Sequence, residues 1–234
     1  FHSLGAKILR KEAHLLGRKP NFVIFDNDDS FSLVKKIVKR FFPKKHGEEK
    51  SRAKKESPAF FAKKISEIKN IERNTNIRMR ANDANVEKIF EEYEGELKKN
   101  NAFDFDDLIE KPVALFQKYP ELLKKYQNKF DAILVDEYQD LNPKQYELIR
   151  LLAGRHKNLS VVGDDEQMIY GWRYADIKIF LDFERDWPSA QIAFLEENYR
   201  STGNIIRAAQ AVAENNQYRR PKNLWTRNPE GAPI

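Results

Sequence analysis

The chain has 234 residues, with 42 lysines and arginines against 36 aspartates and glutamates, and it contains no cysteine. This length allows one large domain or two small ones, and the lack of cysteine excludes a disulfide framework and a thiolate metal site. No apolar run approaches the roughly 20 residues of a membrane span, and the N-terminus lacks a signal-peptide pattern, so we expect a cytoplasmic protein that does not bind membranes.

The first half of the chain is predicted to be largely helical. Apolar residues at helical spacing indicate a short amphipathic helix within residues 4–16 and a second helix that follows an N-cap region at 28–30. Pro43 ends this second helix, and residues 43–57 form a polar, lysine-rich loop. Further helices are expected at 58–70, 83–99 and 105–117.

Residues 35–64 carry most of the positive charge. Twelve lysines and arginines against three glutamates give this window a net charge of +9, so the other residues sum to −3. Such a block attracts polyanions, chiefly nucleic acid. A solvated helix face beside a flexible loop explains the same composition, and the sequence leaves both interpretations open.

The second half alternates short apolar runs with helical patterns. The runs lie at 132–135, 159–162 and 191–195, and each is followed by carboxylates; helices are expected between and after them, at about 143–153, 175–185 and 203–214. Such alternation predicts an α/β fold in which helices flank a parallel sheet. Because ligands bind beyond the carboxyl ends of parallel strands, the polar residues after these runs are the best candidates for an active site.

Asp136 and Glu137 follow the first run directly. A nucleoside triphosphatase needs such a pair, since one carboxylate holds Mg²⁺ and the other orients and deprotonates the attacking water. The pair alone is a weak signal, because strand ends and helix N-caps often carry acidic residues. None of the nine glycines precedes a lysine, so the phosphate-binding loop G-x-x-x-x-G-K-[ST] is absent from these residues.

Three longer motifs strengthen the nucleotide interpretation. They are Val-Asp-Glu-Tyr-Gln-Asp at 135–140, Gly-Asp-Asp-Glu-Gln-Met-Ile-Tyr-Gly-Trp-Arg at 163–173 and Asn-Tyr-Arg-Ser-Thr at 198–202. In this order they resemble the second, third and fourth motifs of the UvrD/Rep/PcrA group of superfamily 1 DNA helicases. Residues 1–10 and 104–108 resemble two flanking segments of the same group, so the resemblance spans nearly the whole chain. It implies a RecA-like sheet with a largely helical N-terminal insertion.

The resemblance implies a role for each matching residue at the nucleotide. Asp136 would bind Mg²⁺, and Glu137 would be the catalytic carboxylate. Gln167 would contact the γ-phosphate or the attacking water. Arg200 would act as an arginine finger, and Tyr199 would stack on the adenine of ATP.

The resemblance also implies residues that contact DNA. Tyr170, Trp172 and Arg173 would lie along the single strand, where aromatic faces stack on bases whatever their sequence. His2 and Ser3 would contact the DNA backbone. As a structural alternative, Tyr170 and Trp172 are core aromatics, although the polar turn around them favours exposure.

Two further alternatives concern charged residues. Tyr199 and Arg200 are also compatible with the start of a helix and a surface ion pair. Asp104, Asp106 and Asp107 could suggest a metal cluster, but we interpret them as structural, with Asp104 or Asp106 capping the helix that follows.

The expected layout is a helical insertion at 1–112, the later part of the first motor lobe at 113–193 and the start of the second lobe at 194–234. We therefore expect part of an ATP-dependent helicase that moves 3′ to 5′ on single-stranded DNA and unwinds duplex DNA, with ATP, Mg²⁺ and the remainder of the helicase as its partners. Without the phosphate-binding loop, these residues alone should not hydrolyse ATP. A non-catalytic DNA- or protein-binding module, or part of a helicase–nuclease, is the alternative.

Overall fold

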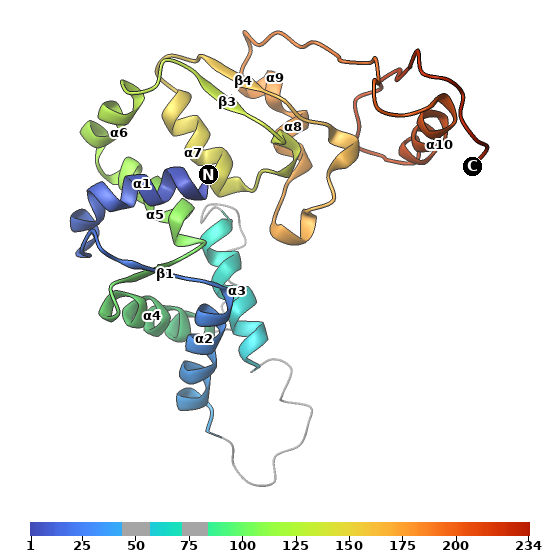
Figure 1. Ribbon diagram of the computed structural model, residues 1–234. Coiled ribbons are helices and arrows are strands. Elements are labelled where there is room, and N and C mark those ends of the chain that lie inside the picture. Colours follow the sequence, from blue (N-terminus) through green and yellow to red (C-terminus); the bar gives the residue numbers. More distant parts are fainter. Residues whose placement is uncertain (44–56, 72–83) are drawn as a thin grey trace. The chain divides into compact units, whose positions relative to one another are not determined.

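The computed structural model describes residues 1–43, 57–71 and 84–234. It confirms the predicted α/β class, since helices flank two small sheets of two strands each (Figure 1). The chain divides into two compact units. The first unit comprises residues 1–133 and 142–159, and the second comprises residues 134–141 and 160–234. None of the helices within the described ranges is long and apolar enough to span a membrane.

The first unit is mainly helical, and it contains one parallel strand pair. Strand β1 pairs with β2 so that Val23 lies opposite Ala102 and Phe25 lies opposite Asp104. Its elements are α1 (His2–Glu12), η1 (Ala13–Leu16), β1 (Val23–Phe25), α2 (Asn27–Phe41), α3 (Pro58–Asn70), α4 (Ala84–Lys99), β2 (Ala102–Asp104), α5 (Asp107–Lys118), α6 (Pro120–Gln127) and α7 (Pro143–Ala153).

Local sequence explains where these helices begin. Asp26 caps α2 by accepting hydrogen bonds from the amides of Asp28 and Asp29, which satisfies donors that have no partner within the helix. Asn142 and Gln145 form a reciprocal capping box at the start of α7. These caps fix the first residues of α2 and α7 through local hydrogen bonds, in addition to the packing of their apolar faces.

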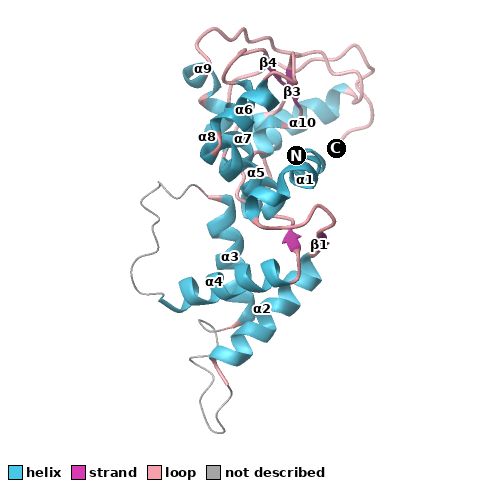
Figure 2. Cartoon of the chain, turned by 90° about the vertical axis from the view of Figure 1, so that its left-hand side faces the viewer, coloured by secondary structure: helices cyan, strands magenta, loops and turns pink. Residues whose placement is uncertain are grey.

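Two packed regions hold the first unit together. Helices α2, α3 and α4, grouped in Figure 2, bury one apolar cluster that includes Ile37, Ile89 and Leu97, all fully buried. Burying each such side chain contributes about 1.5–3 kcal/mol. Helices α1, α5, α6 and α7 enclose the remaining clusters. Helix α1 approaches α5 so closely that a Cβ atom at Gly5 would overlap the carbonyl oxygen of Leu108, so this crossing requires glycine.

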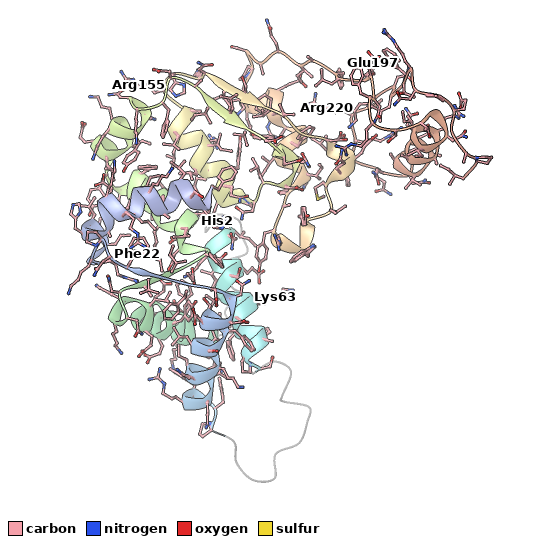
Figure 3. The ribbon with its side chains drawn as sticks, viewed as in Figure 1. His2, Phe22, Lys63, Arg155, Glu197 and Arg220 are labelled. Carbon is pink, nitrogen blue, oxygen red and sulfur yellow. The ribbon has the colours of Figure 1, made fainter. Side chains whose placement is uncertain are left out.

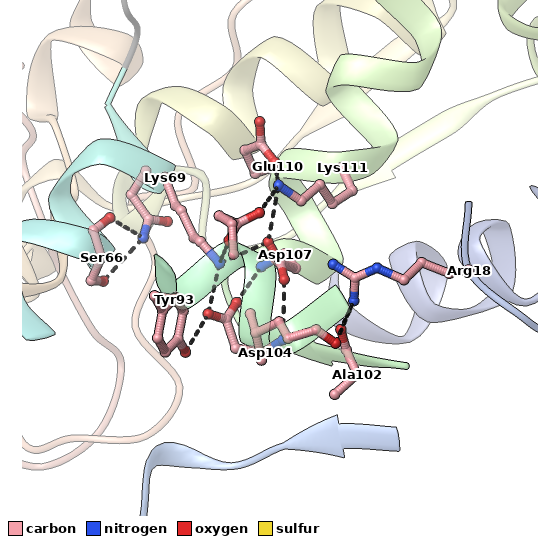
Figure 4. Close-up of polar contacts among 12 residues, drawn as sticks. Arg18, Ser66, Lys69, Tyr93, Ala102, Asp104, Asp107, Glu110 and Lys111 are labelled. Carbon is pink, nitrogen blue, oxygen red and sulfur yellow. Dashed lines mark hydrogen bonds and ion pairs between the residues drawn. The ribbon is translucent and has the colours of Figure 1, made fainter. Parts of the chain in front are cut away.

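A buried ionic cluster joins α3, α4, β2 and α5 (Figure 4). The Lys69 side chain is 1% exposed, and its ammonium lies 2.7 Å from Asp104, 2.8 Å from Asp107 and 2.7 Å from Glu94. Lys111 also pairs with Glu94, at 2.7 Å. We call these five residues the Lys69 cluster. Because each charge has an opposite charge within hydrogen-bonding distance, the cluster avoids the large cost of an isolated buried ion.

The second unit contains the carboxyl ends of the other strand pair. Strands β3 (Ile133–Val135) and β4 (Leu159–Val161) begin in the first unit. They run in the same direction, because the amide of Ile133 donates to the carbonyl of Asn158 and the amide of Val162 donates to the carbonyl of Val135. Its other elements are η3 (Tyr138–Asp140), η4 (Asp165–Gln167), η5 (Gly171–Arg173), α8 (Ile177–Leu181), α9 (Phe183–Asp186) and α10 (Gly203–Ala213).

Several predicted elements are confirmed and others need correction. The helices expected at 58–70 and 143–153 have these bounds, and the first two apolar runs form β3 and β4. The run at 191–195 is not a strand, because no neighbouring strand supplies backbone hydrogen bonds to it within the described ranges; the nearest pairing is an isolated bridge between Glu197 and Trp225. The helix expected at 175–185 is broken at Asp182 into α8 and α9.

Some elements of the structure were not predicted from the sequence, and one predicted loop lies largely outside the described residues. Strands β1 and β2 and helix α6 were not predicted from the sequence. Much of the basic window at 35–64, together with the polar loop predicted at 43–57, lies in residues 44–56, which the structure does not describe.

Candidate functional site at two strand ends

The first strand end of the second unit carries Asp136 and Glu137, both of which are exposed. The amide of Glu137 donates to Oδ1 of Asp136 at 2.9 Å. Glu137 has φ +51°, in the left-handed region that residues with a Cβ atom seldom adopt. Such local strain is common where a side chain must be held in one direction. The sharp turn after β3 therefore presents two adjacent carboxylates to solvent.

Gln139 links this strand end to the next one. Its side-chain amide nitrogen donates to Oε2 of Glu137 at 2.8 Å, and its carbonyl oxygen accepts from the amide of Asp164 at 3.0 Å. Gln139 is only 2% exposed, so this bridging side chain lies beneath the surface, and the two hydrogen bonds are partly buried. A Cβ atom at Gly163 would lie 2.6 Å from the Gln139 carbonyl oxygen, so the glycine leaves room for this side chain to reach Asp164.

At the second strand end, Asp164 contacts both Gln167 and Lys222. The Gln167 amide nitrogen donates to Oδ2 of Asp164 at 2.7 Å, and the Lys222 ammonium contacts Oδ1. Partial burial acts to raise the pKa of Asp164, but the hydrogen bonds from Lys222 and Gln167 outweigh it and hold the pKa below its usual value. The ionised Asp164 thus fixes the side chain of Gln167.

A basic segment after α10 packs against the same acidic turn. Arg219 pairs with Glu166 at 3.1 Å, and the backbone amide of Arg220 donates to the carboxylate of Asp165. The guanidinium of Arg220, labelled in Figure 3, bonds Glu184 at 2.8 Å. Together with Lys222, this segment neutralises three consecutive acidic residues.

Tyr170, Trp172 and Arg173 form an exposed cluster in and beside η5. Trp172 is 70% exposed and Tyr170 is 39% exposed, so the alternative that they are core aromatics is wrong. Their ring centroids lie 6.2 Å apart, and the Arg173 guanidinium lies 4.5 Å from the Trp172 ring. Two aromatic faces beside a guanidinium suit stacking on bases together with contact to phosphate.

Tyr199 and Arg200 lie before α10. The Tyr199 hydroxyl donates to Glu197, labelled in Figure 3, at 2.8 Å, and the ring is 80% exposed. The backbone amide of Arg200 donates to Asn198 at 2.9 Å. Within the described parts of the chain, no hydrogen bond or ion pair joins the Arg200 guanidinium to another residue, so the surface ion pair considered from the sequence is not formed there.

His2 and Ser3 belong to the first unit. They occupy the first turn of α1, and both are exposed. The His2 ring, labelled in Figure 3, meets Phe105 edge-on at 6.1 Å between centroids. The structure therefore brings together Glu137, Asp164 and Gln167 through side-chain contacts, whereas His2 and Ser3 lie in a separate unit.

The carboxylates of β2 and α5 serve a structural purpose. Asp104 and Asp107 both bind Lys69, and Oδ1 of Asp104 accepts from the amide of Asp107 at 2.8 Å. Asp104 thus caps the first turn of α5, whereas Asp106, at the N-cap position, makes no side-chain cap bond. These contacts support the structural interpretation of the aspartates.

Asp136 suits a Mg²⁺ ion that also binds phosphate. Its hydrogen bond to the Glu137 amide engages one carboxylate oxygen, and the side chain is otherwise open to solvent. Mg²⁺ in phosphate-transfer sites is held by one or two carboxylates together with waters and substrate phosphates. No group of three or more candidate ligands occurs among the described residues, so any ion here would depend on the nucleotide for further ligands.

Gln139, Asp164 and Lys222 belong to this network, although the sequence alone predicted no role for them. Gln139 lies within a recognisable motif, but its partner Asp164 is 25 residues away. Lys222 is 58 residues from Asp164. The one sequence signal for this contact is that the motifs at 135–140 and 163–173 each follow a predicted parallel strand, which places them at the same edge of the sheet.

Comparison with known proteins gives consistent matches. The UvrD/REP helicase N-terminal domain matches residues 1–188. Over its whole length the chain is 45% identical to proteins called ATP-dependent DNA helicase PcrA from Staphylococcus aureus (strains Mu50 and NCTC 8325) and from Staphylococcus epidermidis (strain RP62A). The chain spans about a third (32%) of the length of each of these curated relatives.

Proposed function

The chain belongs to the UvrD/REP helicase family, and we propose that it supplies the water-activating and DNA-stacking part of an ATP-dependent DNA helicase. In this proposal the protein moves along single-stranded DNA and unwinds duplex DNA at the expense of ATP. The direction of movement, 3′ to 5′, rests on family resemblance. The proposed boundaries are a helical insertion at 1–112, the later part of the first motor lobe at 113–193 and the start of the second at 194–234.

One observation carries the proposal. The exposed Asp136–Glu137 pair at one strand end is connected through buried Gln139 to Asp164 at the next strand end, and Asp164 holds Gln167. When bound, Mg²⁺ would neutralise phosphate charge beside Asp136. Glu137 would orient the attacking water and accept its proton, and Gln167 would contact the γ-phosphate or that water.

The exposed groups around this network support the remaining roles. Trp172, Tyr170 and Arg173 present stacking faces and a cation to single-stranded DNA, and each stacked base contributes about 1–3 kcal/mol. The Arg200 guanidinium is proposed to neutralise transition-state charge, and the exposed Tyr199 ring is proposed to stack on adenine. His2 and Ser3 are proposed DNA-backbone contacts on α1.

The decisive experiment replaces Glu137 by glutamine in the full-length protein that contains this chain. The substitution removes the base but keeps its size and hydrogen-bonding shape, so kcat for DNA-stimulated ATP hydrolysis should fall about 10²- to 10⁴-fold while DNA affinity is retained. Glu121→Gln, on the exposed surface of α6, is the matched control and should change neither quantity. Normal unwinding by Glu137→Gln would refute the proposed role.

The same assay separates the alternatives. A non-catalytic binding module would bind DNA without turning over ATP in the wild-type protein. A helicase–nuclease would in addition cut DNA through residues outside this chain. The 234-residue chain by itself should not turn over ATP, because it contains no Gly-Lys pair to hold the β- and γ-phosphates.

A further inference from the structure

We propose that Gln139 is the positioning residue that holds Glu137 in its catalytic direction and couples it to the second strand end. This inference rests on the proposed function, because it assigns a supporting role to a residue that would touch neither ATP nor DNA. Gln139 is 2% exposed, whereas Glu137 is exposed, so the carboxylate that faces solvent is held by a side chain beneath it.

The two ends of the Gln139 side chain make different contacts. The amide nitrogen donates to Glu137 at 2.8 Å, and the carbonyl oxygen accepts from the backbone amide of Asp164 at 3.0 Å. A primary amide offers a donor and an acceptor side by side, so glutamine fits both contacts at once. A rotation of the amide by 180° would place its nitrogen against the Asp164 amide, and the two donors would repel each other.

The surrounding backbone fixes this side chain. The amide of Tyr138 donates to the carbonyl of Val162 at 2.9 Å, which ties the turn after β3 to the end of β4 next to the Gln139 contact. Gly163 leaves the room that the carbonyl oxygen of Gln139 occupies. Because Asp164 in turn holds Gln167, a displacement at one strand end is transmitted to the other through three consecutive contacts.

The consequence for the reaction is geometric. A carboxylate on a left-handed turn, with its side chain in solvent, samples several rotamers unless a neighbour holds it. The hydrogen bond from Gln139 restricts Glu137 to one of them. Loss of such support from a catalytic group costs about 10- to 100-fold in rate, and because Gln139 does not reach the substrate, binding of ATP should be little affected.

The test uses two variants of the full-length protein. Gln139→Met removes both contacts at nearly constant size, and Gln139→Glu keeps an acceptor for the Asp164 amide but loses the donor to Glu137. In both, kcat for ATP should fall about 10- to 100-fold while KM for ATP stays within about twofold. Gln127→Met, which removes a hydrogen bond of the same kind to the Leu151 carbonyl, is the matched control and should retain kcat.

Hydrogen exchange followed at the Asp164 amide provides a readout that does not depend on ATP hydrolysis. Exchange should accelerate in Gln139→Met and stay slow in Gln139→Glu, whereas the Tyr138 amide, bonded to Val162, should be unchanged in both variants. Unchanged exchange at Asp164 in Gln139→Met would show that the bridge is not formed in solution.

The outcomes distinguish this inference from the proposed function. If the wild type hydrolyses ATP and Gln139→Glu keeps its kcat within twofold, the positioning role is wrong and the proposed function stands. If the wild type binds DNA without hydrolysing ATP, the proposed function fails, and the positioning role fails with it. Should Gln139→Met not fold, the kcat of Gln139→Glu alone decides whether the positioning role holds.

Discussion

The Lys69 cluster of the first unit and the end of strand β3 in the second unit place their charges in opposite ways. In the first unit, Lys69 is 1% exposed and lies within 2.8 Å of three carboxylates. In the second, Asp136 and Glu137 are exposed, and Arg200 has no side-chain partner within the described residues. Buried charges that satisfy one another stabilise a particular packing, whereas exposed charges without an opposite charge beside them remain available to a ligand. Substitutions in the two units should therefore affect different measurable quantities.

The largest expected effect is on the stability of the first unit. Lys69→Met leaves Asp104, Asp107 and Glu94 buried beside one another with Lys111 as their remaining cation, so the free energy of unfolding should fall by about 3–5 kcal/mol. Denaturant unfolding measures this change. Lys64→Met is the control, because its 2.8 Å pair with Glu67 lies nearer the surface and should cost no more than about 1 kcal/mol. Equal losses in the two variants would contradict the structural role of the cluster.

The second effect is on DNA binding by the second unit. Trp172→Ala should weaken binding of single-stranded DNA by about 1–3 kcal/mol, because it removes an exposed ring on which a base can stack. Fluorescence anisotropy with a labelled oligonucleotide measures the affinity, and denaturant unfolding should show no matching loss of stability. A variant that unfolds more easily but binds DNA normally would reverse the assignment of Trp172.

The smallest effect concerns pH and sharpens the description of the Lys69 cluster. Burial acts to raise the pKa of Glu94, but Lys69 and Lys111 outweigh it and lower the pKa from 4.5 to about 2. A lowered pKa means that Glu94 stabilises the folded state above pH 4.5, and this contribution is lost as the pH falls from 4.5 toward 2. The stability difference between wild type and Glu94→Gln should therefore shrink over this interval, by roughly 1–2 kcal/mol.

The comparison of wild type with Glu94→Gln is needed because Asp107 changes the free energy of unfolding in the opposite direction as the pH falls. Burial raises the pKa of Asp107 even though Lys69 acts to lower it, so protonation of Asp107 favours the folded state in acid. The subtraction removes most of this common contribution. A difference that stays constant from pH 6 to pH 2 would show that Glu94 is not held ionised by the two lysines.

The sequence predicted the strand ends well because their pattern is local. A short apolar run followed by carboxylates identifies a strand and the polar edge beyond it, and β3 and β4 lie where this pattern occurs. The same pattern failed at 191–195, because an apolar run records a preference for burial and does not show whether a neighbouring strand is available. Phe194 and Leu195 are 51% and 87% exposed in the structure.

Contacts between distant residues were beyond prediction from a single sequence. Lys69 is 35 residues from Asp104, and its helical pattern gives no indication that a lysine lies in the core. Gln139 was visible as a motif residue, yet its function as a bridge depends on the pairing of two strands. Roles that depend on residues adjacent in the chain could be inferred from the sequence. Roles that depend on contacts between distant residues became clear only from the three-dimensional structure.

The Lys69 cluster also has an evolutionary consequence. Because Lys69 is bound to Asp104, Asp107 and Glu94 at once, loss of its ammonium leaves three carboxylates in the interior with Lys111 as their remaining cation in the cluster. A neutral residue at position 69 should be strongly epistatic: it is harmful alone and tolerated only after compensating changes among the three carboxylates. Homologous sequences should accordingly either keep Lys69 with its three carboxylates or replace them together, and a route that loses Lys69 first would pass through variants of low stability.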